Sequence, residues 1–450
     1  MMDLKRPHKT MIEVNCQKKY GPIFRLQMGF QEMVVLTGYE TVKEALVNQG
    51  DAFAERASVP FFEDVAKGFG IIFSHGENWK VMQRFTISTL RDYGMGRRTI
   101  EDKITEECRV LIKTMETYAG GLMFPPNKIK HKSILLILIS IISGKKFCFI
   151  TSRFLRLLKL FNENIQLSRT FDMLIYNMFP RLGALLNSCK TRLNNRKELN
   201  AFLQATFKQH LSELGENDQR SFIDSFLVQQ RQKKKTTEGY FHYENFRSVV
   251  SNLFAAGMET TSNTLHWAIL LMMKFPEIQR RVQEEIAKEI GVREPRTEDR
   301  AKMSYTDAVI HEVQRFADIV PSNLPHATTK DITFKGFFIP KGMQIVPLLS
   351  SELHDESHWE KPYEFYPEHF LDAEGKFVKR DAFMPFSAGW RVCAGENLAK
   401  MELFLFFTSL LQKFTFQPPL GTAKDDLNLT PTVGFITSPI PYKTCAIPHS

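Results

Sequence analysis

A single cysteine in the stretch from Phe386 to Gly395, FSAGWRVCAG, has the surroundings of a metal ligand. Cys393 stands just before a helical pattern, and the partial positive charge of a helix N-terminus is expected to lower a thiol pKa and to stabilise the thiolate. Gly389 allows a tight turn and the close approach of a flat group, while Arg391 could meet an anion. Because a lone cysteine is more often a small core residue, this pattern alone leaves both interpretations open.

No other cysteine or histidine lies within zinc-finger spacing of Cys393, so the chain offers one strong sulfur ligand and not four. One thiolate suits a metal whose other ligands belong to a cofactor, as in haem with an axial cysteine. Phe386, Gly389, Arg391, Cys393 and Gly395 stand in register with the haem-binding signature of the cytochrome P-450 family. In detail the chain resembles the vertebrate microsomal family-2 group. The resemblance implies a haem-thiolate monooxygenase that carries iron protoporphyrin IX.

A second chemical pattern interrupts a long apolar helix that we expect at about residues 245–274. The insert AAGMETTSN places polar groups inside a buried helix, which is costly unless these groups are satisfied or used. Thr260 can bond to a carbonyl one turn earlier and open the helix, and Gly257 leaves room for a planar cofactor. Such back-bonding is common in ordinary helices. By the resemblance, however, Glu259 and Thr260 are the acid–threonine pair that delivers protons, and Ala256 lines the pocket.

The resemblance also implies how the haem propionates are held. It assigns them to Trp79, Lys67, His326 and Arg391. The family usually places an arginine four residues after the tryptophan, where this chain has Gln83. Since glutamine can donate a hydrogen bond but cannot neutralise a carboxylate, the substitution predicts weaker haem retention.

Glu312 and Arg315 lie at i and i+3 of an expected helix and can pair. An exposed pair of this kind is worth less than ~1 kcal/mol. The pattern resembles the buried Glu-x-x-Arg pair of the family, which His369 of the segment YPEHF would join in a structural role. The resemblance further places pocket-lining side chains at four positions: Val320, Asn323, Leu324 and Phe435.

The elements expected to position these residues are mostly helical. We expect a mainly α fold with a smaller β lobe near residues 20–40 and 325–350. The 450 residues, of which 43% are hydrophobic, can build a large core, and no linker divides them, so a single domain over 1–450 is predicted. The haem is expected between the long central helix and the helix after Cys393. Residues 119–155 are the least family-like.

Charge and apolar patterns limit the partners. The net charge of +9 permits an acidic partner, but no nucleic-acid motif stands out, and the six scattered cysteines without a CxxC pattern indicate a reducing compartment. A basic face of Lys80, Arg84 and Arg91 could dock an acidic protein or simply be solvated. The longest apolar run, residues 133–143, is too short to span a bilayer and predicts a core helix or strand.

The resemblance supplies the remaining expectations. It implies an NADPH-dependent flavoprotein reductase, with cytochrome b5 as a further electron donor, O2, and a small lipophilic substrate such as a xenobiotic, fatty acid or steroid. It also implies the cytosolic face of the endoplasmic reticulum membrane, although the N-terminal anchor of microsomal members is missing from this sequence. Two alternatives stay open. One is an O2-independent haem-thiolate isomerase or dehydratase, and the other is an inactive, non-catalytic haem-binding protein.

Overall fold

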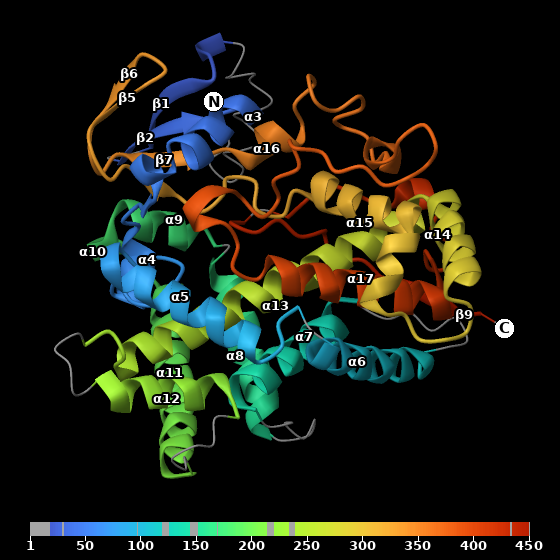
Figure 1. Cartoon of the computed structure of the whole chain (residues 1–450), viewed down its shortest axis with the longest axis horizontal. Helices are drawn as coiled ribbons and strands as arrows, with labels where there is room; N and C mark the ends of the chain where they lie inside the picture. Colours follow the sequence, from blue (N-terminus) through green and yellow to red (C-terminus); the bar gives the residue numbers. More distant parts are fainter. Residues whose placement is uncertain are drawn as a thin grey trace.

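Helices form most of the described chain (Figure 1). The computed structural model describes residues 19–28, 31–96, 98–118, 126–144, 152–168, 170–213, 220–233, 239–432 and 434–449. Its α-helices are α3 (Tyr39–Lys43), α4 (Pro60–Ala66), α5 (Gly76–Asp92), α6 (Arg98–Glu116), α7 (Pro126–Ser143), α8 (Ser152–Ser168), α9 (Phe171–Met178), α10 (Pro180–Gly183), α11 (Asn187–Glu213), α12 (Phe222–Lys233), α13 (Tyr243–Lys274), α14 (Pro276–Glu289), α15 (Ser304–Ala317), α16 (Leu349–Leu353) and α17 (Glu396–Lys413). Shorter 3-10 or π segments are η1 (Glu44–Asn48), η2 (Gly50–Phe53), η3 (Thr297–Lys302), η4 (Pro367–Phe370), η5 (Gly389–Arg391) and η6 (Lys424–Asp426).

The larger sheet joins strands from distant parts of the sequence. The strands of the described chain are β1 (Ile23–Met28), β2 (Gln31–Leu36), β3 (Glu55–Arg56), β4 (His326–Ala327), β5 (Ile332–Phe334), β6 (Phe337–Ile339), β7 (Gln344–Pro347), β8 (Phe414–Gln417) and β9 (Cys445–Pro448). Five of them form one sheet in the order β1-β2-β7-β4-β3, in which β2 and β7 run parallel and the other pairs antiparallel. Two antiparallel pairs, β5-β6 and β8-β9, form separate two-stranded sheets. A mainly helical fold with a smaller β region confirms the predicted fold class.

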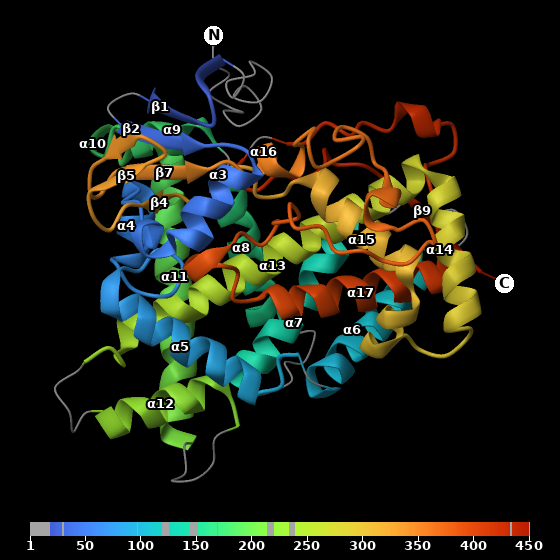
Figure 2. The same cartoon turned by 45° about the horizontal axis from the view of Figure 1, so that its top comes forward.

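Helix α13 lies in the middle of the molecule, as both views show (Figures 1 and 2). Residues on all its sides are apolar and buried over the C-terminal half, from Leu265 to Met273, because α7, α15 and α17 pack against it. A helix that is apolar around its whole circumference is stable only when other elements cover it on every side. The helix that follows Cys393, α17, is likewise apolar and buried over most of its length. These two helices frame the region expected to bind haem.

The apolar run at residues 133–143 lies on α7 and is therefore a core helix. The parts 119–125 and 145–151 of the segment that looked least family-like lie outside the described residues. A Cβ added at Gly257 would lie 3.0 and 3.2 Å from the methyl groups of Leu138 on α7. The missing side chain of Gly257 thus lets α7 and α13 pack closely. The prediction that it makes room for a planar cofactor is wrong, because α7 occupies that space.

A buried ion-pair network braces α15 against the loops that follow it. Arg315 donates two hydrogen bonds to the carboxylate of Glu312, at 2.7 and 2.8 Å, and neither side chain is exposed. Its other donors reach three backbone carbonyls, at 2.7 to 2.8 Å: Leu353, Pro362 and Glu364. His369 adds a contact of 3.2 Å from Nδ1 to the Glu312 carboxylate. All five guanidinium donors are therefore used, which gives this brace a single arrangement.

Candidate active site

The loop before α17 holds Cys393 in a tight turn. The backbone N–H of Cys393 donates to the carbonyl of Phe386 at 3.0 Å, which closes the loop, and α17 begins at Glu396. Gly389 has a φ of 72°, and a Cβ there would overlap the carbonyl oxygen of Leu46 in η1. Glycine at 389 is thus required for contact with η1. The expectation that Gly389 also lets a flat group approach stays a prediction, since the contact with Leu46 concerns only the side on which a Cβ would lie.

The sequence predicted a lowered pKa for Cys393, and this prediction is also wrong. Burial of the thiol raises its pKa, and hydrogen bonds from the backbone N–H groups of Gly395 and Glu396 offset this only in part. The residue as a whole is nevertheless exposed, so the sulfur is confined but can be reached. A Cβ added at Gly395 would meet only the Cys393 sulfur, at 4.0 Å. Since metal binding displaces the thiol proton, this sulfur is suited to a metal and not to free thiolate chemistry.

Arg391 lies two residues before Cys393 and points into the protein, where it is 6% exposed. Its Nε donates to the carbonyl of Ala54 at 2.8 Å, and Nη2 donates to the carbonyl of Ser74 at 2.9 Å and contacts Glu55 at 3.4 Å. The guanidinium stacks 3.7 Å from the ring centre of Trp79. Its remaining nitrogen, Nη1, is buried and finds no partner among the described residues. One charged donor group of Arg391 is thus left for a ligand.

His326 has a second buried nitrogen without a hydrogen-bond partner among the described residues. Its Nδ1 is 2.7 Å from the carbonyl of Phe53 and can only donate to it, while Nε2 is buried without a partner in the described part of the chain. Burial holds the His326 pKa well below its ordinary value, and the positive charges of Arg56 and Arg391 depress it further. An anion at Nε2 would reverse this effect by favouring the imidazolium, which donates from both nitrogens.

Arg56, which the sequence did not single out, completes a buried cationic cluster with Arg391 and His326. It donates to the carbonyls of Ile72 and Leu324 at 3.2 and 2.9 Å. The two arginines share one carboxylate, Glu55, and buried charges of one sign are costly unless an opposite charge compensates them. The two propionates of haem carry the charge that this cluster lacks, so the residues present fit the cofactor that the resemblance implied.

Two other expected haem contacts lie apart from this cluster. Lys67 is exposed at the left-handed residue that ends α4, with a φ of 51°, and makes no hydrogen bond or ion pair with the cluster. Gln83 on α5 donates instead to the carbonyl of Trp390 at 3.2 Å, which ties α5 to the cysteine loop. The structure therefore unites Arg391, His326 and Trp79 but leaves Lys67 outside.

The middle of α13 carries a solvent-accessible face although both flanks are buried. Ala255 and Ala256 are exposed, and Thr260 one turn later is partly exposed. The Thr260 hydroxyl donates to the Ala256 carbonyl at 2.8 Å, which confirms the predicted back-bond. The predicted opening of the helix is absent, since α13 stays helical throughout. An accessible strip of small side chains on a core helix offers room for a ligand.

Glu259 points elsewhere. It is 3% exposed and accepts a hydrogen bond from Asn263 Nδ2 at 2.8 Å, on a different side of α13 from the Thr260 hydroxyl. Glu259 and Thr260 are thus adjacent in sequence, but their side chains bind different partners. A second acid that the sequence analysis missed lies close by: burial raises the pKa of Glu402 on α17 to about 8, and a hydrogen bond with Thr261 of α13 moderates the rise.

The four expected pocket residues fall into two groups. Val320 and Leu324 are partly buried, and Phe435 is 38% exposed. Asn323 is only 4% exposed and donates to the hydroxyl of Ser387 at 2.9 Å. Because Ser387 belongs to the cysteine loop, Asn323 anchors that loop, a role its sequence position did not reveal.

Two phenylalanines that the sequence analysis did not select stand beside Phe435. Phe62 of α4 stacks on Phe73, with ring centres 3.7 Å apart, and meets Phe435 edge to face at 6.0 Å. Phe435 is far from the other two rings in the sequence, and therefore no local pattern could have grouped the three. Together they form an aromatic wall of the kind that binds apolar ligands.

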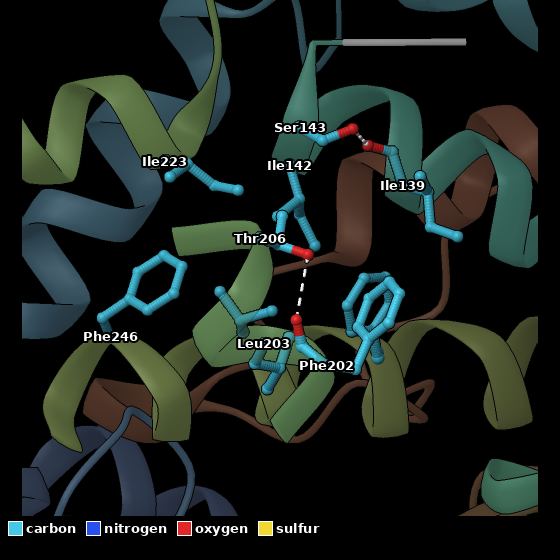
Figure 3. A pocket seen from close by; sticks show the side chains of 10 residues that line it. Ile139, Ile142, Ser143, Phe202, Leu203, Thr206, Ile223 and Phe246 are labelled. Atoms are coloured by element: carbon cyan, nitrogen blue, oxygen red, sulfur yellow. Dashed lines mark hydrogen bonds between the residues drawn. The ribbon is translucent and has the colours of Figure 1, made fainter. Parts of the chain in front are cut away.

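A separate cavity of about 30 Å³ lies among α7, α11, α12 and α13 (Figure 3). Apolar side chains such as Leu203, Ile223 and Phe246 dominate its lining. Its two hydroxyls, on Ser143 and Thr206, are used within their own helices, where they donate to carbonyls one turn earlier at 2.8 and 3.1 Å. The cavity thus presents no free polar group for chemistry and is distinct from the cysteine site.

Comparison with known proteins gives one consistent result. The family model for Cytochrome P450 matches residues 2–446. The chain is 46% identical to Cytochrome P450 2K4 of Oncorhynchus mykiss over 99% of this chain and 88% of that protein. It is 45% identical to Cytochrome P450 2K6 of Danio rerio, over 100% and 89%. It is also 45% identical to Cytochrome P450 2C5 of Oryctolagus cuniculus, over 95% and 88%.

Proposed function

Because this chain belongs to the cytochrome P450 family and is a haem-thiolate monooxygenase, we propose that it hydroxylates small lipophilic compounds such as xenobiotics, fatty acids or steroids. In the net reaction one oxygen atom of O2 enters the substrate and the other leaves as water, with two electrons and two protons consumed. The observation that carries the proposal is the pair of buried nitrogens without a partner among the described residues, Arg391 Nη1 and His326 Nε2. Arg391 lies two residues before Cys393, which is exposed as a residue. That combination matches haem held by its propionates and by a thiolate.

The Cys393 thiolate would hold the haem iron, and the bound group would supply O2 activation, which a thiolate ligand favours. Arg391 Nη1 and His326 Nε2 would receive the propionates, and Trp79 would hold the Arg391 guanidinium in place through its ring. Phe386 would close the loop around the sulfur through its carbonyl. Lys67 remains a candidate for a propionate only if it turns inward from its exposed position.

Substrate would be held on the accessible face of α13. Ala256 leaves space there, and Val320, Leu324 and Phe435 would line the pocket with apolar surface. Such surface excludes water and selects lipophilic molecules.

Proton delivery falls to Thr260 in this proposal. Its hydroxyl donates to the Ala256 carbonyl and keeps its lone pairs free to accept a proton or a water on the accessible side. Glu259 would relay protons only after it turns away from its bond to Asn263.

The experiment for this role is a coupling measurement on the haem-loaded protein with a reductase. Thr260→Ala should lower the product formed per NADPH consumed several-fold, because the proton-holding hydroxyl is lost, while Thr260→Ser should retain most of the coupling. Unchanged coupling in Thr260→Ala would contradict the assignment.

We infer that electrons come from NADPH through a flavoprotein reductase, with cytochrome b5 as a further donor. Lys80, Arg84 and Arg91 are exposed on α5, the helix that Gln83 ties to the cysteine loop. Lys80 already pairs with Glu77 at 2.6 Å, which leaves Arg84 and Arg91 as the stronger attraction for an acidic partner. A docking surface of this kind would weaken with rising salt.

We further propose that the protein works at the cytosolic face of the endoplasmic reticulum membrane. Phe179, Leu182 and Leu185, around α10, are 42, 59 and 67% exposed. Clustered exposed apolar side chains often mark a membrane or protein contact. None of the described helices is long and apolar enough to cross a bilayer.

A further inference from the structure

Arg192 on α11 carries a charge that no carboxylate of the described residues neutralises. Its guanidinium lies 3.4 Å from the ring centre of Phe61 on α4, and its Nη1 lies 3.6 Å from the sulfur of Met173 on α9. Burial lowers the Arg192 pKa to about 9, so the side chain is still a cation at neutral pH. A thioether and a ring face are weak partners for a guanidinium, which can donate five hydrogen bonds.

The neighbouring cations have stronger partners. Arg196, one turn along α11, donates to the backbone carbonyl of Asp64, and Arg247 of α13 pairs with Glu244 at 2.8 Å. The carboxylate of Asp64 already accepts the hydroxyl of Tyr176. Arg192 thus differs from these two arginines in its partners, a ring face and a thioether, and not in its charge. A partly buried cation without an anion is costly, and an anionic ligand would offset that cost.

An aromatic path leads from Arg192 to the pocket. Phe61, on which the guanidinium stacks, is in edge contact with Phe62 at 5.1 Å. Phe62 in turn stacks on Phe73 and meets Phe435, one of the expected pocket residues. The ring contacts run without a break from the cation to Phe435, so an amphiphile with a negative head and an apolar tail would find a partner for each part along this path.

We propose that Arg192 binds the carboxylate of an amphipathic substrate whose apolar chain lies along Phe61, Phe62 and Phe435 toward the active site. This inference rests on the proposed function and narrows its substrate class to lipophilic carboxylates. Arg192 is then a specificity-determining residue, since it selects the substrate by its head group while the aromatic wall accepts the tail. A carboxylate also matches the two-pronged donor geometry of arginine, which a single point charge would not need.

The test is a titration of the haem-loaded full chain with tetradecanoate and with tetradecanol, read from the substrate-induced shift of the haem spectrum. These ligands share a chain and differ in the charge of the head. The wild type should bind the acid about tenfold or more tightly than the alcohol, as expected for a hydrogen bond to a charged group. Arg192→Gln should remove that preference and leave the affinity for the alcohol unchanged.

Matched variants separate a specific contact from a general charge effect. Lys190→Gln removes the same charge from an exposed position two residues away on α11 and should leave both affinities unchanged. Arg192→Lys keeps the charge but not the two-pronged donor and should lose part of the preference. The preference of the wild type for acid over alcohol needs no variant, so it tests the inference even if Arg192→Gln fails to fold.

Three results would overturn the inference. Equal binding of acid and alcohol by the wild type would show that Arg192 does not read the head group. An equal loss for both ligands in Arg192→Gln would show that the arginine only packs against Phe61. Loss of binding to phosphatidylserine vesicles by Arg192→Gln, with both titrations unchanged, would assign the anion to a lipid head group. If one of these three results is found in protein that still oxidises a neutral substrate, the inference alone fails and the proposed function stands.

Discussion

Two regions of the molecule hold an arginine in opposite ways. One is the brace, the buried network around Arg315, and the other is the roof, formed by α4, α9 and α11 around Arg192. In the brace the guanidinium is fully buried and donates five hydrogen bonds, two of them to the carboxylate of Glu312. In the roof it rests on a ring and touches a sulfur. The roof helices α4, α9 and α11 otherwise meet through aromatic contacts and partly exposed polar pairs such as Tyr176 with Asp64.

The difference teaches which part of the molecule has one arrangement and which can adapt. A network with every donor used loses several hydrogen bonds at once if it shifts, so α15 and the segments that Arg315 binds are held in one arrangement. Ring contacts and partly exposed pairs can be rearranged at a cost of about 1 kcal/mol or less each. Under the proposed function, substrate choice would depend on the adaptable roof, while the brace keeps a single arrangement.

The largest expected effect comes from breaking the brace. Arg315→Ala leaves Glu312 buried and unpaired and strips three carbonyls of their donor, so it should cost about 3–5 kcal/mol of unfolding free energy. Chemical denaturation and haem content would measure the loss. The control is Arg25→Ala, which breaks an exposed pair with Glu32 (58 and 48% exposed) and should cost less than about 1 kcal/mol. Similar losses in the two variants would contradict the distinction.

A smaller effect on the unfolding free energy is expected where His75 contacts α4, and this effect should depend on pH. His75 contacts Glu55 through Nδ1 at 3.0 Å and Glu63 of α4 through Nε2 at 3.1 Å, and only the imidazolium can donate to both. The hydrogen bond to Glu55 is the main cause of the raised His75 pKa; burial opposes it and the bond to Glu63 supports it. A raised histidine pKa adds stability that is complete below the unfolded value of about 6.5 and is lost as the pH rises through the folded value.

His75→Gln should therefore cost the most unfolding free energy near pH 5.5 and the least near pH 8.5. The cost near pH 5.5 should exceed the cost near pH 8.5 by less than about 1 kcal/mol, because these side chains are about one-third exposed. Denaturation curves of both proteins across that range would measure it. A cost that does not change with pH would mean that the histidine is neutral in the folded protein.

Local patterns predicted the regular parts of the molecule well. Hydrophobic periodicity and the motif around Cys393 located α13 and α17, and the identity and spacing of Thr260 predicted its bond to the Ala256 carbonyl. Each of these features depends on residues close together in sequence. The brace was expected only by resemblance, since its three carbonyls come from the end of α16 and the loop after it, 38 to 49 residues away from Arg315.

What the sequence could not predict depends on contacts between distant segments. The pKa of Cys393 rises because of how deeply the fold buries its sulfur, and a motif does not contain that information. Gly257 and Gly389 are glycines because Leu138 and Leu46 approach them, from segments far away in the chain. Arg56 lies in a stretch with no clear periodicity, so its place in the cationic cluster gave no signal.

The most direct test of the proposed haem-thiolate site is the ferrous–CO difference spectrum of the expressed chain beside that of Cys393→Ser. The wild type should show the red-shifted Soret band of a thiolate-ligated haem, and Cys393→Ser should lose the band while it keeps its fold by circular dichroism. A folded, haem-loaded wild type without that band, or a serine variant that retains it, would contradict the assignment of Cys393 as the axial ligand.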